Sequence, residues 1–128
     1  MTEHLDVADV LEIARITLGS TPRVRDYGLL ESAVARPRAG LFGADAYPGL
    51  YDKAAALLHS LAGNHALLDG NKRTAWACAL VFLEINGHPL AEPLDEDSAE
   101  EMVCAAAQNQ LSLDDIAHSL ATFTSPGH

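Results

Sequence analysis

Apolar residues recur at helical spacing along most of the chain. The first such stretch follows a candidate N-cap at Asp6 and ends at Gly19. The second runs from Asp26 to Pro37, a residue that cannot continue a helix. In each stretch the apolar positions lie three or four residues apart, which places them on one helix face. The pattern therefore predicts two amphipathic helices joined by a turn over residues 19–25.

The segment 37–49 interrupts this pattern. It contains two prolines and three glycines, which together disfavour a helix. We expect a loop or a small β-hairpin flap here. Leu41 and Phe42 are its most apolar side chains, and we expect them to form the anchor that holds the flap to the rest of the protein.

Four further helices are predicted downstream. Residues 50–63 carry an apolar stripe at helical spacing. The next run, 74–85, is apolar almost all round, which is typical of a central, buried helix; its large or core-forming side chains are Trp76, Ala79, Leu80, Phe82, Leu83 and Ile85. A fifth helix is expected over residues 97–108, and a capping box at Ser112 predicts a sixth that ends near Phe123. These elements predict an all-α bundle of about six helices.

Composition indicates a globular protein with one domain over residues 1–128. The chain is 48% hydrophobic, which is enough for an ordinary core. No apolar run reaches the roughly 18 residues that a membrane span needs, and the first residues lack the features of a signal peptide. Two cysteines are too few for a disulfide framework. We therefore expect a cytoplasmic protein in which Cys78 and Cys104 are reduced and buried.

Charge is divided unevenly along the chain. Residues 1–73 hold all eight Lys and Arg side chains beside nine acidic ones, whereas residues 74–128 hold nine acidic side chains and no Lys or Arg. The net charge of −10 argues against direct binding to nucleic acid or to an anionic membrane. Four arginines precede the third helix, and we expect them to be solvated or, if functional, to recognise substrate: Arg23, Arg25, Arg36 and Arg38.

The segment before the fourth helix gathers the most chemically useful side chains. It reads His65-Ala-Leu-Leu-Asp-Gly-Asn-Lys-Arg-Thr74. Lys72 and Arg73 have the unfavourable sign for a helix start, where free N–H groups carry roughly half a positive charge. A bound anion would offset this mismatch, because helix N-termini with glycine-containing approaches bind phosphate. The segment therefore predicts a nucleotide-phosphate site.

His65 and Asp69 are the candidates for catalysis and metal binding. A free imidazole titrates near pH ~6.5, so His65 can act as a general base at neutral pH; otherwise it is an ordinary surface histidine. Asp69 can hold Mg²⁺, which needs only one or two carboxylates. Its alternative role is that of a helix N-cap.

The next four residues are candidate phosphate ligands. Gly70 permits a turn that lets N–H groups approach an anion, or it is simply a glycine at a helix start. Asn71 can cap the helix or donate its amide N–H to a phosphate. Lys72 offers a point charge, and Arg73 can clamp phosphate with two hydrogen bonds. The alternative for Arg73 is a salt bridge to the acidic C-terminal half.

This spacing resembles that of a known family. His65, Asp69, Gly70, Asn71 and Arg73 match the Fic-domain motif H-P-F-x-[DE]-G-N-G-R. The run Asn-Lys-Arg-Thr-Ala is more similar to the Doc (death-on-curing) toxin branch, in which lysine replaces the second motif glycine. Three further segments extend the resemblance over residues ~5 to ~123: Gly28-Leu-Leu-Glu-Ser-Ala, Lys53-Ala-Ala-Ala-Leu-Leu and Val81-Phe-Leu-Glu-Ile-Asn-Gly. Where Fic proteins have proline and phenylalanine this chain has Ala66 and Leu67, so we expect a looser brace for the loop.

The resemblance implies a compact Fic/Doc-type bundle and an enzyme that uses ATP and Mg²⁺. With lysine at position 72, it implies that the nucleotide binds reversed, with its γ-phosphate toward His65. The reaction would be phosphorylation of a protein hydroxyl on a translation elongation factor (Tu-like), with growth arrest as the result. The flap at 37–49 would hold the target segment in extended form.

The resemblance also implies a cognate Phd-like antitoxin. The self-inhibitory pattern [ST]-x-x-x-E-[GN] of other Fic proteins is missing from the sequence, so restraint would come from a separate partner that folds on binding. Apolar residues of the first helix and the flap would form its seat. The alternatives are an adenylyltransferase that uses the same loop in the usual Fic orientation, and a catalytically silent module that binds a nucleotide or a partner.

Overall fold

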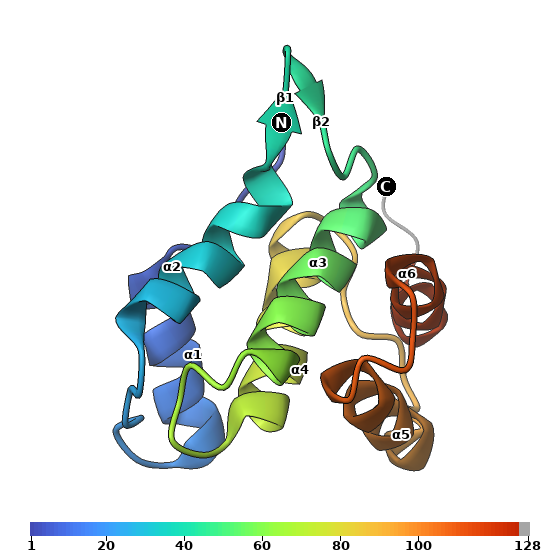
Figure 1. Cartoon of the computed structure of the whole chain (residues 1–128). Helices are drawn as coiled ribbons and strands as arrows, with labels where there is room; N and C mark the ends of the chain where they lie inside the picture. The colour runs from blue at the N-terminus through green and yellow to red at the C-terminus, as the bar shows by residue number, and fades with distance from the viewer. Residues whose placement is uncertain (126–128) are drawn as a thin grey trace.

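Six α-helices and a two-stranded hairpin make up the computed structural model, which describes residues 1–125 (Figure 1). The all-α bundle with a short hairpin is confirmed. The elements in chain order are α1 (Val7–Leu18), α2 (Tyr27–Ala35), the 3₁₀ turn η1 (Arg36–Arg38), β1 (Gly40–Leu41), β2 (Ala44–Asp45), α3 (Leu50–Gly63), α4 (Asn71–Ile85), α5 (Glu96–Ala107) and α6 (Leu113–Phe123).

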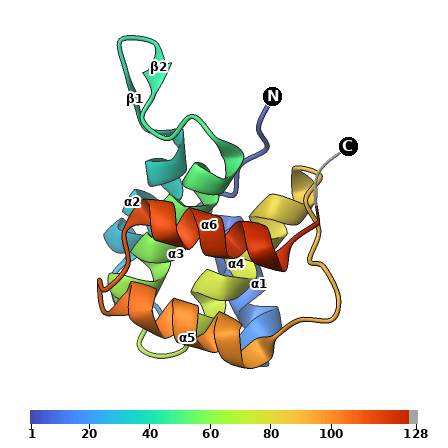
Figure 2. The same ribbon diagram turned by 90° about the vertical axis from the view of Figure 1, so that its right-hand side faces the viewer.

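The helices form three layers around one core. In Figure 1, α3 and α4 lie in the middle, α1 and α2 on one side, and α5 and α6 on the other. Figure 2 shows α5 and α6 side by side as the layer that faces the viewer. The largest side chains that are fully buried come from all these layers, and they include Val10, Leu30, Leu57, Leu58, Phe82, Leu83, Ile116 and Leu120. No helix in residues 1–125 combines the length and apolar character that crossing a bilayer requires.

Local capping explains why most helix ends agree with the sequence. The Asp6 side chain accepts a hydrogen bond from the Asp9 backbone N–H, and Gly19 ends α1 in the left-handed conformation at φ 75°. Asp26 caps α2 in the same way, and Ser112 opens α6 with a capping box. α5 begins one residue earlier than expected, because Asp95 serves as its N-cap.

The start of α4 corrects the sequence prediction. The helix begins at Asn71 rather than at residue 74, because the preceding Gly70 adopts a left-handed φ of 75° and the Thr74 N–H already donates to its carbonyl. Lys72 and Arg73 therefore lie in the first turn of the helix and not in the loop before it. At the other end Ile85 is 46% exposed, so its expected place in the core was wrong.

The hairpin is present, but apolar side chains do not anchor it. Its strands pair in antiparallel register, and all four strand residues are exposed. Leu41 and Phe42 are 70% and 97% exposed, so the predicted anchor is wrong. Polar contacts hold the base instead: the buried Lys53 ammonium donates to the Asp45 carboxylate at 3.1 Å and to the Tyr47 carbonyl.

The two cysteines differ in their environment. Cys78 is buried, and burial raises the pKa of its thiol to about 12, with a smaller contribution from Asp9. Cys104 is only partly buried, which corrects the expectation that both thiols would be inaccessible. Because the thiolate is the reactive form, we expect iodoacetamide at pH 8 to label the folded protein once, at Cys104. Mass spectrometry of the labelled peptides checks this; rapid labelling of Cys78 before unfolding would contradict it.

Candidate functional site

The segment before α4 is held in place by the connection between α1 and α2. We call residues 64–70 the motif loop and residues 23–26 the strap. An isolated antiparallel bridge pairs Val24 of the strap with Leu67 of the motif loop, and further backbone hydrogen bonds lie on either side of it. The chemistry-bearing loop is thus fixed by a segment about 40 residues earlier in the chain.

Ala66 and Leu67 brace the loop from the core side. They are 1% and 2% exposed, so Leu67 fills an apolar socket as expected. Asn71 contributes a second brace: the Leu67 N–H donates to its Oδ1 at 3.0 Å, and its Nδ2 donates to the Leu67 carbonyl at 2.9 Å. The predicted role of the Asn71 side chain as a helix cap is wrong, because Gly70 is the N-cap. Its role as a phosphate donor stays a prediction, because only one of its two amide N–H groups is bonded to the loop.

Gly70 opens the N-terminus of α4 to a ligand. Its φ of 75° favours glycine, and an added Cβ would lie 2.6 Å from Leu18 Cδ2. No side chain in residues 1–125 caps this helix end. The first backbone N–H groups of α4, from Asn71 to Arg73, therefore keep their hydrogen-bonding capacity for an anion.

His65 and Asp69 are both exposed at the rim of the loop. His65 has a φ of 56°, which is uncommon for a residue other than glycine. Asp69 lies 3.6 Å from the Arg23 guanidinium, an exposed pair that contributes little stability. Because Gly70 occupies the N-cap position, the alternative role of Asp69 as a helix cap is wrong.

The described residues contain no ready-made metal centre. No group of three or more His, Cys, Asp or Glu side chains in residues 1–125 is placed to hold an ion. Mg²⁺ keeps several waters and takes phosphate oxygens, so one or two protein carboxylates are enough to hold it. The exposed carboxylate of Asp69 fits that requirement.

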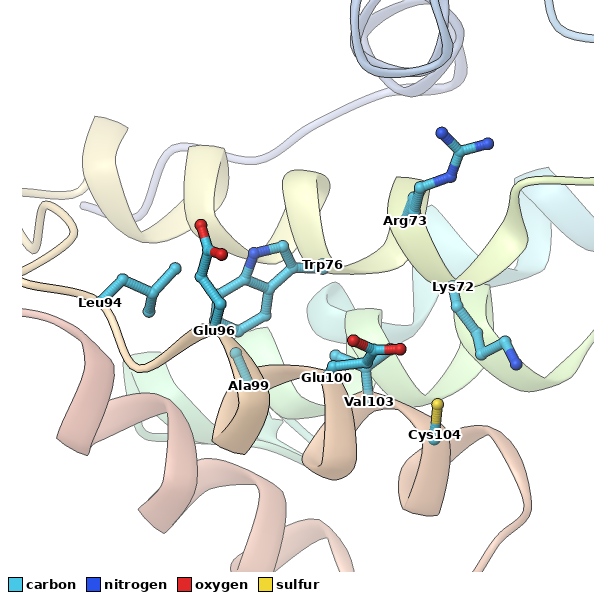
Figure 3. Close-up of a pocket in the computed structure, with 9 residues that line it drawn as sticks. All are labelled: Lys72, Arg73, Trp76, Leu94, Glu96, Ala99, Glu100, Val103 and Cys104. Carbon is cyan, nitrogen blue, oxygen red and sulfur yellow. The ribbon is translucent and has the colours of Figure 1, made fainter.

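A cleft of about 560 Å³ opens between the first turns of α4 and the length of α5 (Figure 3). Lys72 and Arg73 lie at one end, and Leu94 and Glu96 lie at the other, with Trp76 between them. Figure 3 shows Arg73 pointing away from α5, whereas Lys72 extends toward the end of the cleft that holds Cys104. His65 and Asp69 are not part of its walls.

The arrangement of cations around the site is only partly as expected. In residues 1–125 Arg73 forms no ion pair, which rules out the expected alternative of a salt bridge to the C-terminal half. Arg36 is not solvated: it donates to Tyr47 Oη at 3.1 Å and to Ser60 Oγ at 3.0 Å, beside His59. The charge of Arg36 thus helps to hold the segment after the hairpin against α3.

The remaining histidines have structural or surface roles, as the sequence suggested. His4 packs on Phe82, His59 and His88 take part in side-chain hydrogen bonds, and His118 contacts a carbonyl of its own helix. His128 lies outside the described residues.

Sequence reasoning missed the α5 wall of the cleft and the contribution of Trp76. The position of Trp76 was readable, because it lies one helical turn after Lys72 and must project from the same side of α4. The packing of α5 against that side depends on the fold and has no local signal in the sequence.

The hairpin projects from the end of the molecule that lies away from the motif loop (Figures 1 and 2). In both views the hairpin lies at one end of the molecule, and α1 and the motif loop lie toward the other (Figures 1 and 2). The length of α3 separates the hairpin from the motif loop by roughly 20 Å at ~1.5 Å per residue. No contact with a target or an antitoxin is seen in residues 1–125, so the roles of the hairpin in holding a target segment and, with α1, in seating an antitoxin stay predictions.

Comparison with known proteins agrees with the resemblance seen in the motif. A model of the Fic/DOC family matches residues 4–83. The chain is 58% identical over 123 residues to Toxin Doc of Mycolicibacterium smegmatis (strain ATCC 700084 / mc(2)155). The aligned residues cover 96% of this chain and 95% of that protein. It is 29% identical over 102 residues to Protein kinase doc of Escherichia phage P1, with 80% and 78% of the two chains covered. On these matches and on the motif that precedes α4, the chain belongs to the Fic/DOC family, in its Doc toxin branch.

Proposed function

We propose that this chain is a toxin that transfers the γ-phosphate of ATP to a hydroxyl group of a translation elongation factor and so arrests growth. The observation that carries the proposal is the open N-terminus of α4. Its free N–H groups and the first-turn residues Lys72 and Arg73 lie at one end of a cleft large enough for part of a nucleotide. The relative named Protein kinase doc supports phosphoryl transfer, and the relative named Toxin Doc supports the biological effect.

Each residue of the site has a role in this reaction. His65 takes the proton from the attacking hydroxyl as the bond from that oxygen to the γ-phosphorus forms, while the bond from the γ-phosphorus to the β,γ-bridging oxygen breaks and ADP leaves. The backbone N–H groups after Gly70, together with Lys72 and Arg73, bind the phosphate oxygens. Asp69 would hold Mg²⁺, which would supply positive charge beside the phosphates. The Asn71 side chain braces the loop with one of its two amide N–H groups, so its second amide N–H and its backbone N–H remain for the nucleotide.

The cleft suits the base of the nucleotide. Its walls are largely apolar, and Trp76 presents an aromatic surface one turn beyond Lys72. A nucleotide that spans the site would therefore place its base against Trp76 and its phosphates over the start of α4.

Trp76 is the chain's single tryptophan, so its fluorescence reports on the cleft alone. We expect Mg-ATP to quench or shift this emission, because stacking changes the environment of the indole. Inorganic tripolyphosphate carries the same kind of charge without a base and should leave the emission nearly unchanged. ATP binding seen by calorimetry without a change in emission would place the base elsewhere.

Labelled ATP tests the reaction. The purified protein is incubated with Mg²⁺, elongation factor and ATP labelled at either the γ or the α position. We expect the factor to retain the γ label and not the α label. Retention of the α label would instead establish an adenylyltransferase, the second candidate, which the match to the Fic/DOC family as a whole supports. Retention of neither label, with ATP still bound, would establish a silent binding module.

A cognate antitoxin and a cytoplasmic site of action complete the proposal. A toxin that acts on translation must be restrained in its own cell, and the pattern of self-inhibition is missing from the sequence. We therefore propose a Phd-like partner with a segment that folds on binding. Co-expression with the neighbouring reading frame, followed by purification of a stable complex and recovery of growth, tests this part.

A further inference from the structure

The backbone at His65 is held in an uncommon conformation. Its φ of 56° lies in the left-handed region, which L-amino acids other than glycine adopt rarely. The direction of the Cα–Cβ bond, and with it the position of the imidazole, depends on this dihedral angle. Whatever holds the peptide that follows His65 therefore also sets where the imidazole can reach.

The side chain of Arg25 contacts that peptide directly. Its Nε donates to the His65 carbonyl at 2.6 Å, and its Nη2 donates to the Asn64 carbonyl at 3.3 Å. Hydrogen bonds from a charged donor are stronger than those between neutral groups. One guanidinium thus spans the two carbonyls on either side of the His65 Cα.

The motif loop is also held by contacts that do not involve this guanidinium. The backbone N–H groups of Arg25 and Asp26 both donate to the Ala66 carbonyl, at 2.7 and 3.1 Å. The Asn64 and Asn71 side chains bond to the loop, and Leu67 is buried beneath it. Removal of the Arg25 side chain should therefore leave the loop folded and free only the peptide of His65.

We propose that Arg25 is a positioning residue for His65. It keeps the imidazole aligned with the hydroxyl that is to be deprotonated, and it does not touch the nucleotide or the target. This inference rests on the proposed function for its kinetic test, but it makes a separate statement about the geometry of the free protein. Positioning of this kind affects the chemical step, because small displacements of a catalytic group lower the rate steeply.

The kinetic test uses Arg25→Met, which removes the guanidinium and keeps most of the side-chain length. We expect kcat to fall by about 10- to 100-fold, with KM for ATP changed by less than about twofold. Arg25→Lys, which can still donate one hydrogen bond, should recover part of the rate. Arg38→Met is the control, because it removes an equally exposed cation beside the hairpin, away from the motif loop. An unchanged kcat, or a rise in KM alone, would overturn the proposal.

A structural test separates this inference from the proposed function. In the isotope-labelled free protein, NMR signals of the His65 amide and ring should shift or broaden in Arg25→Met. Signals of Leu67 and Asn71 should stay in place. If the His65 signals do not change, Arg25 does not position it, whatever reaction the protein performs. If they change and the wild-type protein transfers neither phosphate nor AMP, the positioning role stands and the proposed function fails.

Discussion

Replacement of His65 by alanine should lower the rate of phosphoryl transfer by about 10²- to 10⁴-fold, the range over which a general base contributes. The exposed imidazole has no hydrogen-bond partner in residues 1–125; only the backbone carbonyl of His65 is bonded, to Arg25. Its removal should therefore change the midpoint of thermal unfolding only slightly. Label transfer from γ-labelled ATP, together with thermal unfolding followed by circular dichroism, measures both quantities.

His118→Ala is the matched control for this experiment. His118 is also exposed, and its ring contacts only the Asp114 carbonyl within α6. It should lose neither activity nor stability. Equal transfer rates of His65→Ala and wild type would show that His65 is not the general base. Growth arrest by the variant in cells without antitoxin would show that the toxic effect does not depend on His65.

Local chemistry explains which parts of the fold could be predicted. A side chain at Asp6, Asp26 or Ser112 satisfies backbone N–H groups a few residues away, so the helix starts that depend on it can be read from the sequence. The start of α4 was misplaced because its cap is Gly70, whose role depends on a left-handed φ and not on a side chain.

Contacts between distant segments explain what could not be predicted. The strap meets the motif loop across about 40 residues, and no periodicity of either segment reveals their pairing. The base of the hairpin is held by a buried lysine, whereas hydrophobicity pointed to Leu41 and Phe42. The types of the candidate site residues were readable from the sequence. The partners that hold them, Arg25 for His65 and the Leu67 backbone for Asn71, were not.

The positive charge at the start of α4 has a consequence for the unbound protein. Lys72 and Arg73 add to the partial positive charge of the helix N-terminus, which is unfavourable without an anion. The cleft walls carry Glu96 and Glu100, yet neither forms an ion pair with these cations within the described residues. Under the proposed function, nucleotide phosphates would supply the close negative charge that no ion pair supplies to Lys72 and Arg73 in the described residues.

Gly70→Ala should destabilise the protein by about 2–4 kcal/mol, as the sum of two effects. The left-handed conformation at φ 75° is unfavourable for alanine, and the alanine Cβ would lie 2.6 and 2.7 Å from the two methyl carbons of Leu18. Gly19→Ala provides the matched control, because Gly19 has the same φ of 75° and its added Cβ would meet nothing within 4 Å. That variant should lose only about 1–2 kcal/mol.

A double-mutant cycle isolates the crowding against Leu18. In the background of Leu18→Ala, Gly70→Ala should lower the free energy of unfolding only as much as Gly19→Ala does. The coupling free energy between positions 18 and 70, measured by urea unfolding, should therefore be about 1–2 kcal/mol. Gly70→Ala should also weaken the response of Trp76 emission to Mg-ATP, because the shifted turn moves the first N–H groups of α4. If Gly70→Ala lowers the free energy of unfolding no more than Gly19→Ala does, the Leu18 side chain rotates away freely. The close approach of Leu18 would then not fix the shape of the phosphate site.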